Sequence, residues 1–173
     1  TIQTGDSLGG IAAWGSDGSA YALGAQITFI SEGTISAGVV PAYIRFNTTS
    51  AGGVATERVR IDSAGFVTLT GPLGRGAPVT KTGDFTLAAT ENWVICNKGS
   101  ATAVTLPSAS LWTGREVYFK TIQAQQVDSV ASDVVPNTTA TPGTVILPGT
   151  DGAWCTIVSD GTNWIRMASS TIA

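Results

Sequence analysis

The chain contains no histidine among its 173 residues. Histidine is the commonest general base, the commonest metal ligand and the usual activator of a nucleophilic serine or cysteine. Its absence therefore removes the familiar Ser-His and Cys-His arrangements, and we predict that the chain is not an enzyme and carries no cofactor or metal.

Charge is also scarce. Charged residues make up 12% of the chain, the net charge is −3, and the nine lysines and arginines are scattered singly. Contacts to phosphates need clustered positive charge, so we predict no nucleic-acid partner. No apolar run approaches the roughly 18 residues of a membrane span, so we predict no membrane insertion. A low content of charged residues together with a positive mean hydropathy predicts a weakly polar surface. We expect contact between chains to bury such a surface.

Only two cysteines are present, Cys96 and Cys155. Two cannot build a disulfide framework, and no third or fourth metal ligand stands near either of them. Each lies in an apolar stretch, so we expect both to be buried free thiols; a bridge between adjacent strands is the alternative. The chain does not begin with Met and shows no signal peptide, so we expect a fragment or a processed product.

Glycine, in contrast, is abundant, with 21 residues, and it separates short stretches of period-two alternation. The clearest is Glu57–Leu69, where two alternating apolar pairs flank a turn at Asp62–Gly65, which predicts a β-hairpin. A lone hairpin is only marginally stable in water, so its apolar face must pack against another part of the protein or another chain. Arg58 and Arg60 follow Glu57 closely, so we expect this carboxylate to form an ion pair.

The rest of the chain predicts an all-β protein of two domains, residues 1–75 and 76–173, joined by the glycine- and proline-rich segment 71–78. We expect residues 1–10 to be rich in turns, and no segment keeps a helical period. The second domain should be a small β-sandwich or barrel-like knob. The remaining predicted strands are 25–30, 43–47, 86–88, 92–96, 104–107, 116–122, 123–127, 144–147, 153–159 and 164–168.

Two parts of the chain resemble known modules of bacteriophage and prophage tail fibres. Residues 8–70 resemble shaft modules, through the pieces WGSDGSAYALGAQITF, PAYIRFNTTSAGG and ERVRIDSAGFVTL. Residues 82–168 resemble C-terminal β-knob modules, through VTLPSASLWTGREVYFK and WCTIVSDGTNWIRMAS. The resemblance implies an intertwined trimeric β shaft followed by a knob. It also implies a homotrimer in the virion, a phage tail part assembled in the host cytoplasm that binds a bacterial surface glycan or lipopolysaccharide.

Two other functions stay open. A tailspike fragment that degrades polysaccharide would need paired carboxylates, but most aspartates lie in turns and no pair stands out. A secreted bacterial adhesin or lectin domain is the second alternative. Gly5-Asp6-Ser7-Leu8 spells the signature of a hydrolase family with a serine nucleophile, but without a histidine to take the serine proton we interpret it as a turn.

Aromatic side chains are the best candidates for ligand binding, because sugar faces stack on tryptophan and tyrosine. Trp112 lies in a predicted loop, and Trp14 and Tyr21 flank a predicted turn, so these three are the candidate binding residues. The polar segment 123–137 is a possible ligand-binding loop. The other tryptophans lie in predicted strands, where we expect them in the core: Trp93, Trp154 and Trp164.

Overall fold

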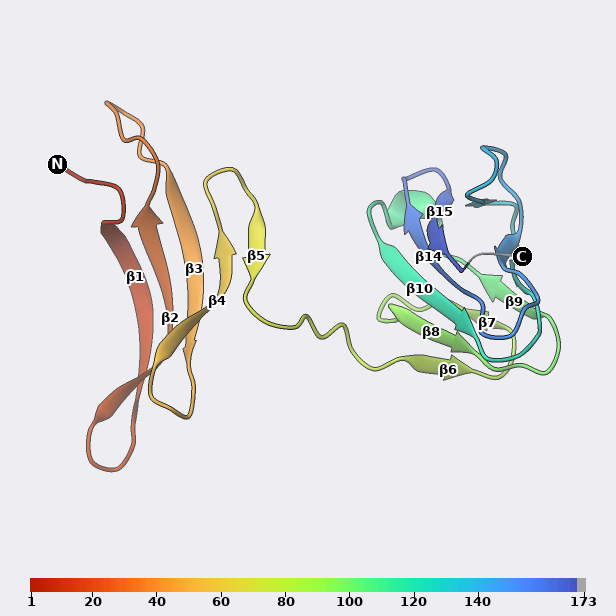
Figure 1. The fold of residues 1–173 in the computed structure, drawn as a ribbon, viewed down its shortest axis with the longest axis horizontal. Coiled ribbons are helices and arrows are strands. Elements are labelled where there is room, and N and C mark those ends of the chain that lie inside the picture. The colour runs from red at the N-terminus through yellow and green to blue at the C-terminus, as the bar shows by residue number, and fades with distance from the viewer. Residues whose placement is uncertain (171–173) are drawn as a thin grey trace. The chain divides into compact units, whose positions relative to one another are not determined.

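The computed structural model of the chain describes residues 1–170, and both of its units are built from β-strands (Figure 1). The first unit is Thr1–Gly74, and the second begins at Arg75. Within the described residues, the one helical element is the short 3-10 helix η1 (Ala109–Leu111). The predicted all-β class is confirmed. The division between the units falls inside the glycine- and proline-rich segment 71–78.

The first unit is a single antiparallel sheet in which each strand pairs with the next along the chain. The Asp62–Gly65 turn joins its last two strands as predicted. The carboxylate of Asp62 accepts hydrogen bonds from the backbone N–H of Ala64 (3.0 Å) and Phe66 (2.8 Å), and Gly65 has a φ of +83°, which favours glycine. The strands are β1 (Ser7–Ser16), β2 (Tyr21–Ser31), β3 (Ala42–Thr49), β4 (Ala55–Ile61) and β5 (Val67–Leu69).

Strand β1 corrects in part the prediction that residues 1–10 are rich in turns, because the strand includes the last four of them. It begins at Ser7 and pairs with β2 as far as Ser16, opposite Tyr21. Gly9 and Gly10 concealed the strand, because glycine gives no alternation signal. At Gly10 a Cβ atom would lie 2.6 Å from the carbonyl oxygen of Ile27, so glycine permits the close approach of these two strands.

The second unit consists of two sheets, and the chain alternates between them. One sheet has the order β12-β15-β14-β10-β8-β6 and the other the order β13-β11-β9-β7. Strands β6, β8 and β10 run parallel in the first sheet, while β7, β9 and β11 run parallel in the second. The strands are β6 (Val79–Lys81), β7 (Phe85–Thr86), β8 (Trp93–Cys96), β9 (Thr102–Thr105), β10 (Glu116–Thr121), β11 (Val127–Ser129), β12 (Val134–Val135), β13 (Val145–Leu147), β14 (Trp154–Ser159) and β15 (Trp164–Ser169).

The hydrophobic core lies in this second unit, and it contains every buried hydrophobic residue of the described chain except Ile30. Trp164 is fully buried, as predicted, and its indole N–H donates to the carbonyl of Pro107 (3.0 Å). Cys96 and Cys155 are buried free thiols, which confirms the prediction. Burial raises the pKa of the Cys96 thiol to about 11 and that of Cys155 to about 12.

Three expectations for this unit were wrong in part. Trp93 and Trp154 are half-buried rather than core residues, because the residues that follow them in their strands, Val94 and Cys155, take the inward positions. The segment 123–127 is not a strand; β11 begins at Val127. The segment 123–137, expected as a loop, contains both β11 and β12.

Candidate functional site

One face of the first unit's sheet is apolar across all five strands, and we call it the apolar face. The apolar residues form two rows that run across the strands, and in the first row each residue lies opposite the next one on the neighbouring strand. A second row follows the same pairing from β2 to β5. The first row is Ile11, Ile27, Phe46, Val59 and Leu69, and the second is Phe29, Ile44, Ile61 and Val67.

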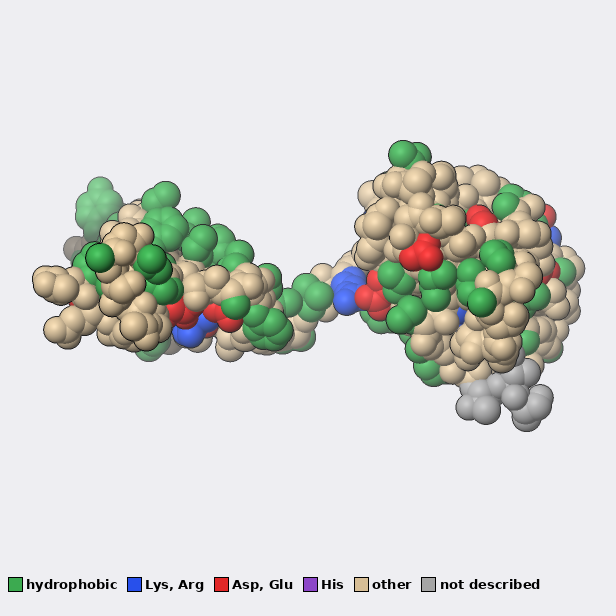
Figure 2. Space-filling view, turned by 90° about the horizontal axis from the view of Figure 1, so that it is seen from above, with side chains coloured by type: hydrophobic (Ala, Val, Ile, Leu, Met, Phe, Trp, Pro, Cys, Tyr) green, Lys and Arg blue, Asp and Glu red, His purple; other side chains and the backbone are tan. Residues whose placement is uncertain are grey.

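The apolar face is open to solvent. Ile11 is 69% exposed and Phe46, in the middle of the first row, is 37% exposed. A hollow of about 320 Å³ on this sheet is lined by Ile11, Ile27, Phe46 and their neighbours. Figure 2 shows hydrophobic side chains gathered along one side of the first unit, with a group of acidic and basic side chains on the opposite side. Removal of such a face from water is favourable, because burial of apolar surface is the dominant favourable term in folding and association.

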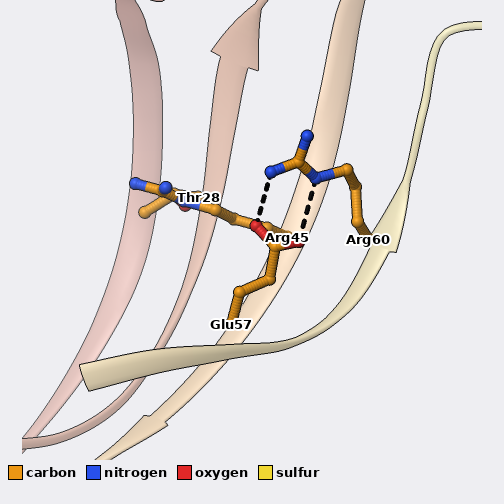
Figure 3. A network of polar contacts seen from close by, with 4 residues as sticks. All are labelled: Thr28, Arg45, Glu57 and Arg60. Carbon is orange, nitrogen blue, oxygen red and sulfur yellow. Dashed lines mark hydrogen bonds and ion pairs between the residues drawn. The ribbon is translucent and has the colours of Figure 1, made fainter. Parts of the chain in front are cut away.

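The opposite face of the same sheet is polar and carries a network of charged side chains (Figure 3). Arg60 donates two hydrogen bonds to the carboxylate of Glu57, at 2.9 and 2.8 Å, which confirms the predicted ion pair. These hydrogen bonds raise the pKa of Arg60. Arg45 donates to the hydroxyl of Thr28 (2.7 Å), and the guanidinium of Arg60 lies 4.3 Å from the centre of the Tyr43 ring.

Two of the three predicted binding residues, Trp14 and Tyr21, lie near the β1–β2 turn of the first unit. Trp14 is opposite Leu23 and Tyr21 is opposite Ser16, so Trp14 and Tyr21 project from the same face of the hairpin. Their side chains are 60% and 78% exposed. The structure thus brings these two aromatic residues together at an accessible end of the sheet.

Trp112, the third predicted binding residue, belongs to the second unit and follows η1. Its ring packs edge-on against the core residue Trp164, with the ring centres 5.9 Å apart, so it is half-buried rather than fully exposed. The guanidinium of Arg115 lies 4.6 Å from the ring centre of Trp112. A depression of about 380 Å³ is lined by Trp112, Arg115 and the exposed Leu111.

A second aromatic group, which the sequence did not reveal, lies on the outer surface of the six-stranded sheet. Trp93, Tyr118 and Trp154 come from β8, β10 and β14, which are neighbours in the sheet. The Trp93 and Tyr118 ring centres are 4.9 Å apart, and those of Tyr118 and Trp154 are 5.7 Å apart. The signal in the sequence was the alternation of these residues with smaller apolar ones, which fits either face of a strand.

Two turn carboxylates, Asp17 and Asp160, are held in the ionised form. Hydrogen bonds from the backbone N–H groups of Ala20 and Ser19 lower the pKa of Asp17 to about 2. Asp160 has a lowered pKa because Asn163 and Thr162 donate to it in the same way. A general acid needs the opposite shift.

Ser7 of the Gly5–Leu8 motif is the first residue of β1. Residues 1–170 contain no group of three or more residues that could hold a metal ion, and within this range no helix has the length and apolar character to cross a membrane. Comparison of the chain with protein-family models and with curated proteins finds no match.

Proposed function

We propose that this chain is a segment of a bacteriophage or prophage tail fibre that works as a structural and adhesive part of the virion. Its first unit would form part of a homotrimeric shaft, and its second unit would bind a bacterial surface glycan or lipopolysaccharide. On this proposal the chain attaches the particle to its host without catalysing a reaction.

The apolar face is the observation that carries the proposal. The first unit has 74 residues, and Ile30 is its one buried hydrophobic side chain. Burial of apolar surface is the dominant favourable term in folding, so a unit that buries so little of its own requires cover from outside. Copies of the same chain can supply that cover, because cyclic assemblies place the same face of each subunit around one axis.

The distribution of charge supports association through this face. The ion pair of Glu57 with Arg60, and Arg45 beside them, lie on the polar face, so copies that meet through the apolar face would not have to desolvate these charges. Obligate interfaces resemble a domain core divided between chains. The two cross-strand rows of the apolar face have that composition.

The second unit supports the adhesive half of the proposal. It has its own core of 16 buried hydrophobic residues, so it offers a rigid scaffold for exposed recognition groups. The aromatic residues at its surface are suited to stacking on sugar rings.

The proposal is tested by binding of the purified oligomer to immobilised lipopolysaccharides and capsular polysaccharides from a panel of bacteria. We expect saturable binding to at least one saccharide, with no release of reducing ends from it. Binding to none of a broad panel would contradict the adhesive function. Steady release of reducing ends would instead establish a polysaccharide-degrading enzyme.

A further inference from the structure

Trp93, Tyr118 and Trp154 form a continuous strip on the outer surface of the six-stranded sheet, which we call the aromatic strip. Inward-facing residues of β8, β10 and β14 alternate with them and belong to the core, whereas the three aromatic residues lie outside it. The ring planes of Tyr118 and Trp154 are within 10° of parallel, and Trp93 is tilted by 44° from Tyr118. The three rings therefore form one contiguous aromatic group that crosses three strands.

Hydrogen-bonding groups border the aromatic strip. Thr156 lies directly opposite Tyr118 in the pairing of β10 with β14, and Lys120 lies opposite Trp154. Lys120 is exposed and forms no ion pair with any other described residue. The aromatic strip thus has a hydroxyl group and an ammonium group without an ion-pair partner beside it.

The size of the aromatic strip fits a small ligand rather than a protein partner. A fully covered aromatic side chain buries 150–250 Å², and these three are already half-buried, so together they offer about 200–400 Å². A stable protein–protein interface needs about 800 Å² from each partner. A pyranose ring, in contrast, has one face of C–H groups that packs on an aromatic ring and a rim of hydroxyl groups that hydrogen bonds to polar neighbours.

We propose that the aromatic strip is an oligosaccharide-binding site of the second unit. Sugar rings pack on Trp93, Tyr118 and Trp154, while Lys120 and Thr156 hydrogen bond to the hydroxyl groups or to an acidic substituent. The site is separate from the depression beside Trp112. This inference rests on the proposed function in one respect, namely that the receptor is a saccharide.

The test begins with the immobilised saccharide that the wild-type protein binds best, with dissociation constants measured for a set of variants. We expect Tyr118→Ala and Trp154→Ala each to weaken binding about tenfold, the loss of roughly one stacking contact. Tyr118→Phe keeps the ring and should bind within about twofold of the wild type. Leu111→Ser removes an apolar side chain that is 80% exposed beside Trp112, so it serves as the matched control and should not change binding.

A second measurement on the wild-type protein does not depend on how the variants fold. The indole N–H resonances of Trp93 and Trp154 should shift when soluble oligosaccharide from the same source is added, while that of Trp14 should not. Unchanged affinity in both alanine variants, or resonance shifts confined to Trp112, would show that the aromatic strip is not the binding site. Either result would leave the proposed adhesive function intact. A wild-type protein that binds no saccharide at all would overturn both.

Discussion

Replacement of Phe46 by alanine tests whether the apolar face is covered by other copies of the chain. Phe46 occupies the central strand of the sheet, between Ile27 on β2 and Val59 on β4. In a single chain its side chain is 37% exposed and lies beside the hollow of about 320 Å³. In an assembly closed through this face, the same side chain would be fully buried.

The expected magnitude differs sharply between the two cases. Truncation of a buried phenylalanine to alanine costs about 3–5 kcal/mol per site. About 1–2 kcal/mol of this is lost in the separate chain as well, so a trimer with three such sites loses about 3–12 kcal/mol of assembly free energy. In a chain that stays alone, the ring is only partly covered, and the loss is about 1–2 kcal/mol. Since each 1.4 kcal/mol is a factor of ten in an equilibrium constant, the first case weakens the association constant of the trimer by a factor of at least about one hundred.

Sedimentation velocity and thermal unfolding at several protein concentrations measure this effect. Thr68→Ala is the matched control, because Thr68 pairs with Arg60 on the polar face and is exposed; its substitution should change stability by no more than about 0.5 kcal/mol. We expect Phe46→Ala to sediment as a smaller species and to unfold at a lower temperature than the control. A Phe46→Ala variant with the wild-type sedimentation coefficient and melting temperature would refute the reasoning.

Three further predictions follow from individual residues. Gly10→Ala should destabilise the first unit by about 1–3 kcal/mol in chemical unfolding, because the new Cβ would meet a β2 carbonyl oxygen at 2.6 Å; wild-type stability would contradict this. Cys96 and Cys155 should resist a thiol reagent at pH 8 until the protein unfolds, because burial raises the pKa of both; rapid labelling of the native protein would contradict it. Burial alone would raise the pKa of Glu91, but hydrogen bonds from Lys81 and a backbone N–H outweigh it and lower the pKa. Its stabilisation should therefore be complete above the ordinary value of 4.5 and be lost as the pH falls below it. Glu91→Gln should therefore reduce the fall in melting temperature between neutral and acid pH. An unchanged fall in melting temperature would contradict the stabilising role of the Glu91 carboxylate.

The sequence predicted those parts of the fold whose signals are local. The Asp62–Gly65 turn followed from a side chain that bonds its own backbone and a glycine that tolerates positive φ. The ion pair of Glu57 with Arg60 followed from close spacing in one strand. The segment 71–78, rich in glycine and proline, marked the boundary between the two units along the chain.

The features that the sequence did not predict depend on contacts between distant segments. Strand β1 is defined by its pairing with β2, and its glycines carry no periodicity of their own. Trp93 and Trp154 lie in strands whose two faces are both apolar, so alternation alone could not assign the inward face. The aromatic strip exists because β8, β10 and β14 become neighbours in the sheet, and no spacing along the chain encodes that order.

The apolar face could be predicted from the sequence only in part. Its alternating residues were visible in the Glu57–Leu69 hairpin, and their need for cover could be inferred from that alternation. The alignment of Ile11, Ile27 and Phe46 into one row required the strand register.

The most direct test of the account is the mass of the native wild-type particle at micromolar concentration, measured by native mass spectrometry. The account predicts one dominant species with three times the mass of the 17.6 kDa chain. A dominant, folded species of 17.6 kDa would contradict it, because a single chain would then be stable with its apolar face in water.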